Sequence, residues 1–225
     1  MLVLYNLAIA VAEVLYIFSI TLVMDALVER KRISGSIARK VIHLWMGGLI
    51  IFWFLFNSQY AQLLFSIPVL IFVAVMLSAL SGKGAHKKVL KFARMDNLYE
   101  VVYGPLIFMA MFVLFTAFAF RSIAGVAALC AMVFGDGIAP IAGKYACVHY
   151  ANGLKSLEGS AAFFIASLVS IYALTSILIP GGFTLRVSRV AVLASAIGAI
   201  AEGVTPGKLD NLMVPILVWL TFLLV

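Results

Sequence analysis

The sequence predicts an all-α integral membrane protein, a polytopic bundle of about eight transmembrane helices. Hydrophobic residues make up 65% of the 225 residues and charged residues only 11%, and the mean hydropathy is +1.17. Charged residues usually make up about a quarter of a soluble domain, so this composition excludes a soluble globular protein. Lipid cannot pair backbone N–H and C=O groups, and we therefore expect the apolar stretches to be helical.

Eight apolar stretches approach the length of roughly 20 residues that a helix needs to cross about 30 Å of hydrocarbon. They cover residues 3–28, 40–57, 60–80, 102–120, 122–141, 160–180, 187–203 and 210–225. The last stretch is short and the join at Arg121 is abrupt, so seven or nine spans stay open. We expect the first stretch to be a span, because it is too long for the apolar region of a cleavable signal peptide and has no basic segment before it.

Basic residues are divided unequally between the two sides of these spans. Thirteen of the sixteen lie in segments after the first, third, fifth and seventh spans. Cytoplasmic segments of membrane proteins are enriched in Lys and Arg, so both termini are expected to face outward. The pI near 9.5 then reflects segments beside anionic lipid, and nucleic-acid binding is not expected. The segments expected to face the cytoplasm are 29–39, 81–98, 142–159 and 204–209.

Four polar motifs lie at the cytoplasmic ends of the predicted spans. They are "ARKVIHLWMGG" (38–48), "FGDGIAPIAGK" (134–144), "KSLEGS" (155–160) and "AEGVTPGKLDNLMVP" (201–215). Ionisable residues at such positions are costly, and function is the default explanation for them. We expect the motifs to converge on one site. The basic stretch at 82–94 has no accompanying carboxylate pattern and is expected to be a solvated loop.

The second motif carries the strongest signal. Gly135, Gly137 and Gly143 permit close backbone approaches, and Pro140 bends or ends a helix. We expect a break in the span whose exposed amides bind phosphate oxygens. The spacing differs from the Walker motif, and no strand precedes it, which excludes a dinucleotide fold. Asp136 needs a partner, which Mg²⁺ on a substrate phosphate would supply; the alternative is a kinked span in which a lysine pairs with this aspartate.

The first motif places a basic stripe at the start of the second span. Helical spacing puts Arg39, His43 and Gly47 on one face, with Lys40 nearby. A positive stripe beside a glycine suits a phosphate group. The alternative is that Arg39 and Lys40 only anchor the span at the cytoplasmic interface.

Three further acids repeat the pattern of the second motif. Glu158, Glu202 and Asp210 each have a glycine and a basic residue close by, as Lys155 precedes Glu158. Together with the aspartate of the second motif they suggest a site for a magnesium-bound nucleotide. Glu13 lies near the middle of the first span, where we expect a buried polar contact or a protonated carboxyl group.

"RKVIHLWMGG", "GDGIAPIAGK", "KSLEGS" and "DNLMVP", in this order, resemble the family of dolichol kinases, phytol kinases and CTP-dependent diacylglycerol kinases. The resemblance covers residues 38–216, whereas residues 1–37 form a span without a family motif. It implies a single membrane domain, 1–225, that moves the γ-phosphate of a nucleoside triphosphate, usually CTP, to a lipid alcohol with Mg²⁺. The short length resembles the compact prokaryotic phytol or geranylgeraniol kinases, so the cell membrane of a prokaryote is the expected location.

The resemblance and the motif chemistry together give a set of candidate site residues. The family's functional positions carry over to Arg39, Lys40, Asp136 and Gly143, and with weaker support to Lys144, Lys155, Glu158 and Asp210. The predicted catalytic residues are Asp136, Lys40, Arg39 and His43. The predicted nucleotide-binding residues are Gly135, Gly137, Gly143, Lys144 and Lys155. The predicted metal ligands are Asp136, Glu158, Glu202 and Asp210.

Two other functions fit parts of the pattern. A CTP-dependent phospholipid cytidylyltransferase would use similar acids and bases but would release pyrophosphate. A transporter with broken helices would bind its ligand near the midplane, whereas these motifs gather at one face and no inverted repeat is visible. The sequence fixes neither the alcohol, the nucleotide nor the oligomeric state.

Overall fold

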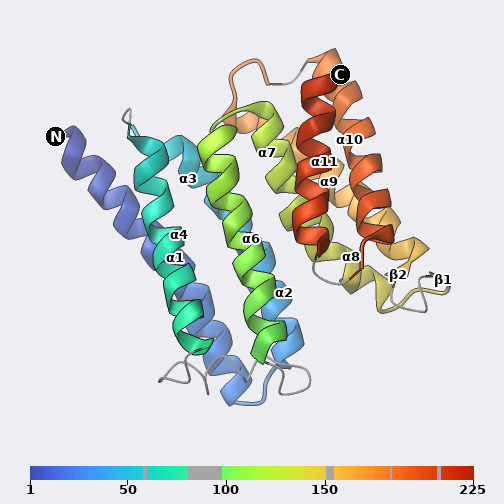
Figure 1. The fold of residues 1–225 in the computed structure, drawn as a ribbon, viewed down its shortest axis with the longest axis horizontal. Coiled ribbons are helices and arrows are strands. Elements are labelled where there is room, and N and C mark those ends of the chain that lie inside the picture. Colours follow the sequence, from blue (N-terminus) through green and yellow to red (C-terminus); the bar gives the residue numbers. More distant parts are fainter. Residues whose placement is uncertain (58–59, 81–97, 151–154, 183, 207–208) are drawn as a thin grey trace. The chain divides into compact units, whose positions relative to one another are not determined.

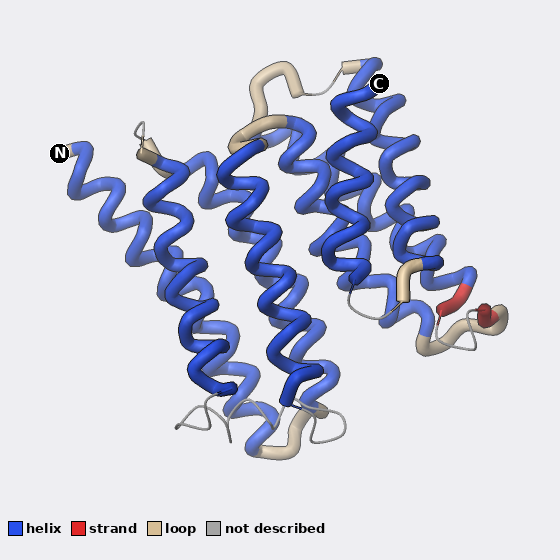
Figure 2. Tube along the Cα trace, in the orientation of Figure 1, coloured by secondary structure: helices blue, strands red, loops and turns tan. Residues whose placement is uncertain are grey.

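The computed structural model describes residues 1–57, 60–80, 98–150, 155–182, 184–206 and 209–225, with backbone alone at 79–80 and 98–101. The regular structure of the described residues consists of helices and two very short strands, joined by loops and turns (Figure 2). Six of its helices are long and apolar enough to cross a membrane, and two shorter apolar helices cover Val102–Phe118 and Asp210–Leu224. The predicted all-α polytopic bundle is confirmed. The expected loop at 82–94 lies outside the described residues.

The chain divides into two compact units, Met1–Ala117 and Phe118–Val225. Whether they form the single membrane domain expected from the sequence stays a prediction. The first unit holds α1 (Leu2–Glu29), α2 (Gly35–Trp45), η1 (Met46–Gly48), α3 (Leu49–Leu55), α4 (Ala61–Leu80) and most of α6 (Leu98–Phe118). The second unit holds α7 (Ile123–Cys130), η2 (Ala131–Gly135), α8 (Asp136–Gly143), β1 (His149–Tyr150), β2 (Lys155–Ser156), α9 (Leu157–Leu178), α10 (Leu185–Val204) and α11 (Asp210–Leu224) (Figure 1).

Side-chain hydrogen bonds join the helices of the first unit. The indole of Trp53 on α3 donates to Thr116 Oγ1 on α6 at 3.0 Å, and both residues are fully buried. The Asn6 side chain of α1 both donates to the carbonyl of Asn57, at 3.0 Å, and accepts from its amide, at 2.8 Å. Glu13 is also fully buried, and neither of its carboxylate oxygens has a hydrogen-bond partner among the described residues. The expectation that it is buried therefore holds.

The second unit is built around the continuous helical segment Ile123–Gly143. In an 18-residue stretch of this segment 78% of the residues are buried, against 22–44% in the other candidate spans. Helices α9 and α11 pack against it, and α10 packs against both of them. Other helices of this unit therefore cover the segment, as expected for a helix that is apolar on all sides from residue 123 to 133.

The break expected in the second motif is wrong. The chain stays helical from Ile123 to Gly143, with a π-helical segment at Ala131–Gly135 and Pro140 inside α8. A helix persists because backbone groups at this depth need partners within the protein. The π-helix absorbs the irregularity that the glycines and the proline introduce.

Gly135 is explained by close packing against α9. A Cβ atom at this position would lie 2.8 Å from the Phe163 ring and 2.3 Å from Ser167 Oγ. Phe163 and Ser167 are both fully buried on α9. Only a residue without a side chain lets η2 and α9 approach this closely.

We expect Gly135→Ala to lower the stability of the folded protein by about 1–3 kcal/mol, because overpacking forces neighbouring atoms to shift. Thermal unfolding in detergent measures the loss. The double variant Gly135→Ala with Ser167→Ala, which removes the nearest clashing atom, should recover part of it. Unchanged stability in the single variant would show that packing does not explain this glycine.

Candidate metal centre

Three acids distant in sequence meet in the second unit. Asp136 begins α8, Glu202 lies near the end of α10, and Asp210 begins α11. One carboxylate oxygen from each lies within 4.8 Å of the other two. The exposed fractions of these residues are only 6%, 3% and 7%. We call these three residues the acid cluster.

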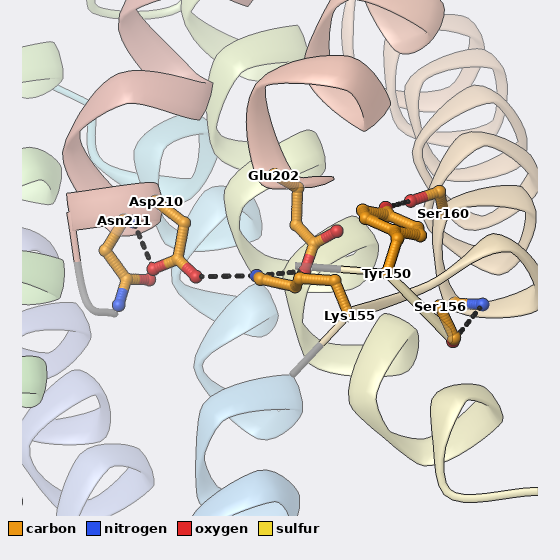
Figure 3. A network of polar contacts seen from close by, with 8 residues as sticks. Tyr150, Lys155, Ser156, Ser160, Glu202, Asp210 and Asn211 are labelled. Carbon is orange, nitrogen blue, oxygen red and sulfur yellow. Dashed lines mark hydrogen bonds and ion pairs between the residues drawn. The ribbon is translucent and has the colours of Figure 1, made fainter. Parts of the chain in front are cut away.

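Lys155 on β2 provides a positive charge within the acid cluster. Its ammonium donates to Glu202 Oε1 and lies 3.4 Å from Asp210 Oδ2 (Figure 3). Burial works to lower the pKa of Lys155, but the hydrogen bond to Glu202 and the charges of all three acids raise it above its ordinary value of 10.5. Because the pKa is raised, the contribution of the Lys155 charge to stability is present at neutral pH and is lost as the pH rises through the higher folded value. At low pH the ion pair is lost because its carboxylates take up protons.

A short antiparallel hairpin positions Lys155. Strands β1 and β2 pair with Tyr150 opposite Lys155. The hydroxyl of Tyr150 lies 2.6 Å from Ser160 Oγ on α9, and a Cβ atom at Gly203 on α10 would lie 2.5 Å from the Tyr150 hydroxyl (Figure 3). The ring therefore docks the hairpin where α9 and α10 meet. Sequence reasoning missed Tyr150, because a lone tyrosine in an interfacial loop carries no chemical pattern.

The start of α9 is fixed by a local hydrogen bond, and Asp210 makes one inside the first turn of α11. Ser156 Oγ accepts from the amide of Gly159 at 3.0 Å, an N-cap that begins α9 directly after Lys155. Asp210 Oδ1 accepts from the amide of Asn211 at 2.9 Å. The side-chain oxygen of Asn211 is buried and has no hydrogen-bond partner among the described residues. It is a further oxygen next to the acid cluster that sequence reasoning passed over, although it stands in the quoted "DNLMVP".

The predicted ligand Glu158 lies outside the acid cluster. Its Oε1 atom accepts hydrogen bonds from the amides of Cys147 at 2.7 Å and Val148 at 3.3 Å. The first turn of α9 directs this side chain to the turn that follows α8. Its contacts therefore indicate a structural role in holding that turn.

The predicted glycines lie in η2 and α8, and Lys144 directly follows α8. Gly137 is buried within α8. Gly143 ends this helix, and a Cβ atom there would lie 3.0 Å from Ser156 Oγ. Lys144 is exposed, and its ammonium lies 5.5 Å from the centre of the Tyr145 ring. These positions do not form the expected open loop.

The predicted basic stripe belongs to the first unit. Arg39, Lys40 and His43 lie on α2 and are partly exposed. The His43 ring packs against Phe108 of α6 with 4.4 Å between ring centres. Helix α2 begins at an N-cap, where Ser34 Oγ accepts from the amide of Ile37 at 3.4 Å.

Comparison with known proteins identifies relatives among plant enzymes. A "Probable phytol kinase, chloroplastic" of Triticum aestivum is 29% identical over 158 residues, which are 68% of this chain and 53% of the relative. "Phytol kinase 1, chloroplastic" of Arabidopsis thaliana is 27% identical over 214 residues, 88% of this chain and 69% of the relative. "Probable phytol kinase 2, chloroplastic" of Glycine max is 31% identical over 157 residues, 68% of this chain and 50% of the relative.

The similarity to phytol kinases over most of the chain supports an assignment to the polyprenol kinase family. The family resemblance carried by the four motifs is thereby confirmed. The chain spans about half the length of the Triticum aestivum and Glycine max relatives. No family model matches the chain, and no solved structure does.

The chemistry of the acid cluster suits a hard divalent cation. The chain brings three carboxylates together around one ammonium, which leaves an excess of two negative charges. The candidate ligand atoms of the acid cluster are all carboxylate oxygens. Mg²⁺ prefers such oxygens and usually binds through one or two carboxylates together with substrate phosphates. The residues therefore fit a magnesium ion.

The different contacts of Glu158 and Asp210 lead to a prediction. Glu158→Gln should lower the midpoint of thermal unfolding, because a neutral amide accepts weaker hydrogen bonds from Cys147 and Val148, and should leave divalent-cation affinity unchanged. Asp210→Asn should weaken that affinity, because it removes a charged oxygen of the cluster. Titration of Mn²⁺ followed by electron paramagnetic resonance measures both. Equal losses of affinity would mean that Glu158 is a ligand after all.

Proposed function

We propose that this chain is a lipid-alcohol kinase that transfers the γ-phosphate of CTP to phytol or a related polyprenol-type alcohol. The observation that carries the proposal is the buried acid cluster of Asp136, Glu202 and Asp210, in a chain whose relatives bear the name phytol kinase. Phosphoryl transfer needs little covalent chemistry from the protein. It needs acids for a metal, cations for phosphate oxygens, and fixed positions for both.

The proposed reaction assigns tasks to residues of the second unit. A magnesium ion, when bound, would neutralise the β- and γ-phosphate oxygens. The carboxylate oxygens of Asp136, Glu202 and Asp210, which three different helices keep in place, would hold that ion. The alcohol oxygen forms a bond to the γ-phosphorus, the bond from phosphorus to the β–γ bridging oxygen breaks, CDP leaves, and a cluster carboxylate accepts the hydroxyl proton. Burial of the carboxylates strengthens each of these electrostatic contacts.

Further residues are proposed to contact the nucleotide. Lys155 contacts two acids of the cluster, and Lys144 directly follows the helix that carries Asp136. Both suit phosphate oxygens as point charges. Arg39, Lys40 and His43 are proposed as phosphate-binding residues of the first unit. The excess of basic residues in the segments that carry these motifs favours a site on the cytoplasmic face. A lipid alcohol would then enter from the bilayer and present its hydroxyl group at that interface.

Incubation of purified protein with phytol, geranylgeraniol or dolichol and radiolabelled CTP tests the reaction directly. Label from the γ position should enter the lipid, and label from the α position should remain in water-soluble CDP. The opposite result, with α-label in a lipid and release of pyrophosphate, would replace the kinase by a cytidylyltransferase. Equal incubations with ATP and UTP would establish the nucleotide.

Asp136→Asn should fold and insert normally but lose roughly 100-fold or more in kcat, on the scale of about 3 kcal/mol for one preorganised electrostatic group. The amide keeps the size of the side chain and removes only its charge. Initial rates of γ-label transfer measure the effect. Glu29→Gln is the matched control, because Glu29 is an exposed acid at the end of α1 and should keep full activity. Near-normal turnover of Asp136→Asn would make Asp136 a structural acid.

A further inference from the structure

The ammonium of Lys155 contacts two of the three carboxylates that the proposed magnesium site needs. We propose that Lys155 is a built-in counter-ion of the acid cluster, which a divalent cation displaces and which then binds the triphosphate. The inference rests on the proposed function, because it concerns the same three acids. It assigns to Lys155 two successive positions, where the motif alone indicated only nucleotide binding.

The acid cluster has room for one cation between its oxygens. One oxygen of each acid lies within 4.8 Å of the others. Oxygens that share one Mg²⁺ at 2.0–2.1 Å are at most about 4.2 Å apart, so a cation bound by these atoms lies between them. The Lys155 ammonium already lies between oxygens of Glu202 and Asp210 (Figure 3). Two cations in the same small, buried space repel each other strongly, and the flexible one has to withdraw.

The negative charge of the acid cluster requires a counter-ion. Three buried carboxylates without a counter-ion would be strongly destabilising. Lys155 neutralises one of these three charges and holds Glu202 and Asp210 close together. The carboxylate oxygens are therefore preorganised before a metal binds, and metal binding does not have to bring them together. A divalent cation then takes over contacts that exist already.

Lys155 and the three acids differ in rigidity. The acids stand on α8, α10 and α11, whereas Lys155 stands on a strand of two residues. Its side chain is 18% exposed, against 4% for that of Glu202. A lysine carries its charge on a flexible four-carbon stem, so the ammonium can leave the cluster while Tyr150 and Ser156 keep the backbone in place. Phosphate oxygens beside the metal would be the nearest new partners for it.

Two measurements on the intact protein in detergent test the proposal. The first is Mn²⁺ affinity without nucleotide, by electron paramagnetic resonance, for the wild type, Lys155→Met and Lys31→Met; Lys31 is exposed and outside the acid cluster. Mn²⁺ accepts the same oxygen ligands as Mg²⁺. The second is the rate at which an amine-reactive reagent labels Lys155 in the wild type, relative to Lys31, with and without Mn²⁺, by mass spectrometry.

Displacement predicts that Lys155→Met binds Mn²⁺ roughly tenfold more tightly than the wild type, a coupling of ordinary size, and that Lys31→Met does not. It also predicts that Mn²⁺ increases labelling of Lys155 in the wild type. The labelling separates displacement from simple loss of a repelling charge, and it needs no variant to fold. Unchanged or decreased labelling on Mn²⁺ binding overturns the proposal, even if γ-phosphate transfer proceeds normally. Absence of Mn²⁺ binding to every protein would overturn both this proposal and the metal site of the proposed function.

Discussion

The ion pair network of Lys155 with Glu202 and Asp210 is the interaction on which the second unit depends. It joins β2, α10 and α11. Lys155 is 47 residues from Glu202 and 55 residues from Asp210 in the sequence. Removing one partner from such a buried network leaves an uncompensated charge. The caps and packing contacts around it serve to keep this geometry: Ser156 begins α9, and Tyr150 docks the hairpin that carries the lysine.

Composition and hydropathy predicted the helices well. The eight predicted spans correspond to described helical stretches with ends shifted by a few residues, the largest shift being that of the second, which begins at Gly35 and not at 40. The reason is physical: in lipid only a helix satisfies the backbone of a long apolar segment. The start of α2 was missed because Ser34, an N-cap, extends this helix into a basic segment that hydropathy alone assigns to a loop.

The site was predicted in part. Asp136, Glu202, Asp210 and Lys155 were singled out because ionisable residues beside apolar spans are costly, and the structure brings these four together. The same argument selected Glu158, since sequence does not reveal which way the first turn of α9 points. The glycines were interpreted as a phosphate-binding loop, although Gly135 faces Phe163. Local sequence shows where a side chain is missing but not which neighbour fills the space.

The π-helical segment at Ala131–Gly135 determines which way the side chains of α8 point. A π-helix accommodates one extra residue compared with a regular α-helix, and one residue corresponds to about 100° of rotation around the axis. Asp136 and Gly137 are buried directly after this segment, so their azimuth depends on it. The segment thus fixes the helical phase of α8. A chain that gained or lost one residue here would keep an apolar span, but its Asp136 carboxylate would face a different neighbour.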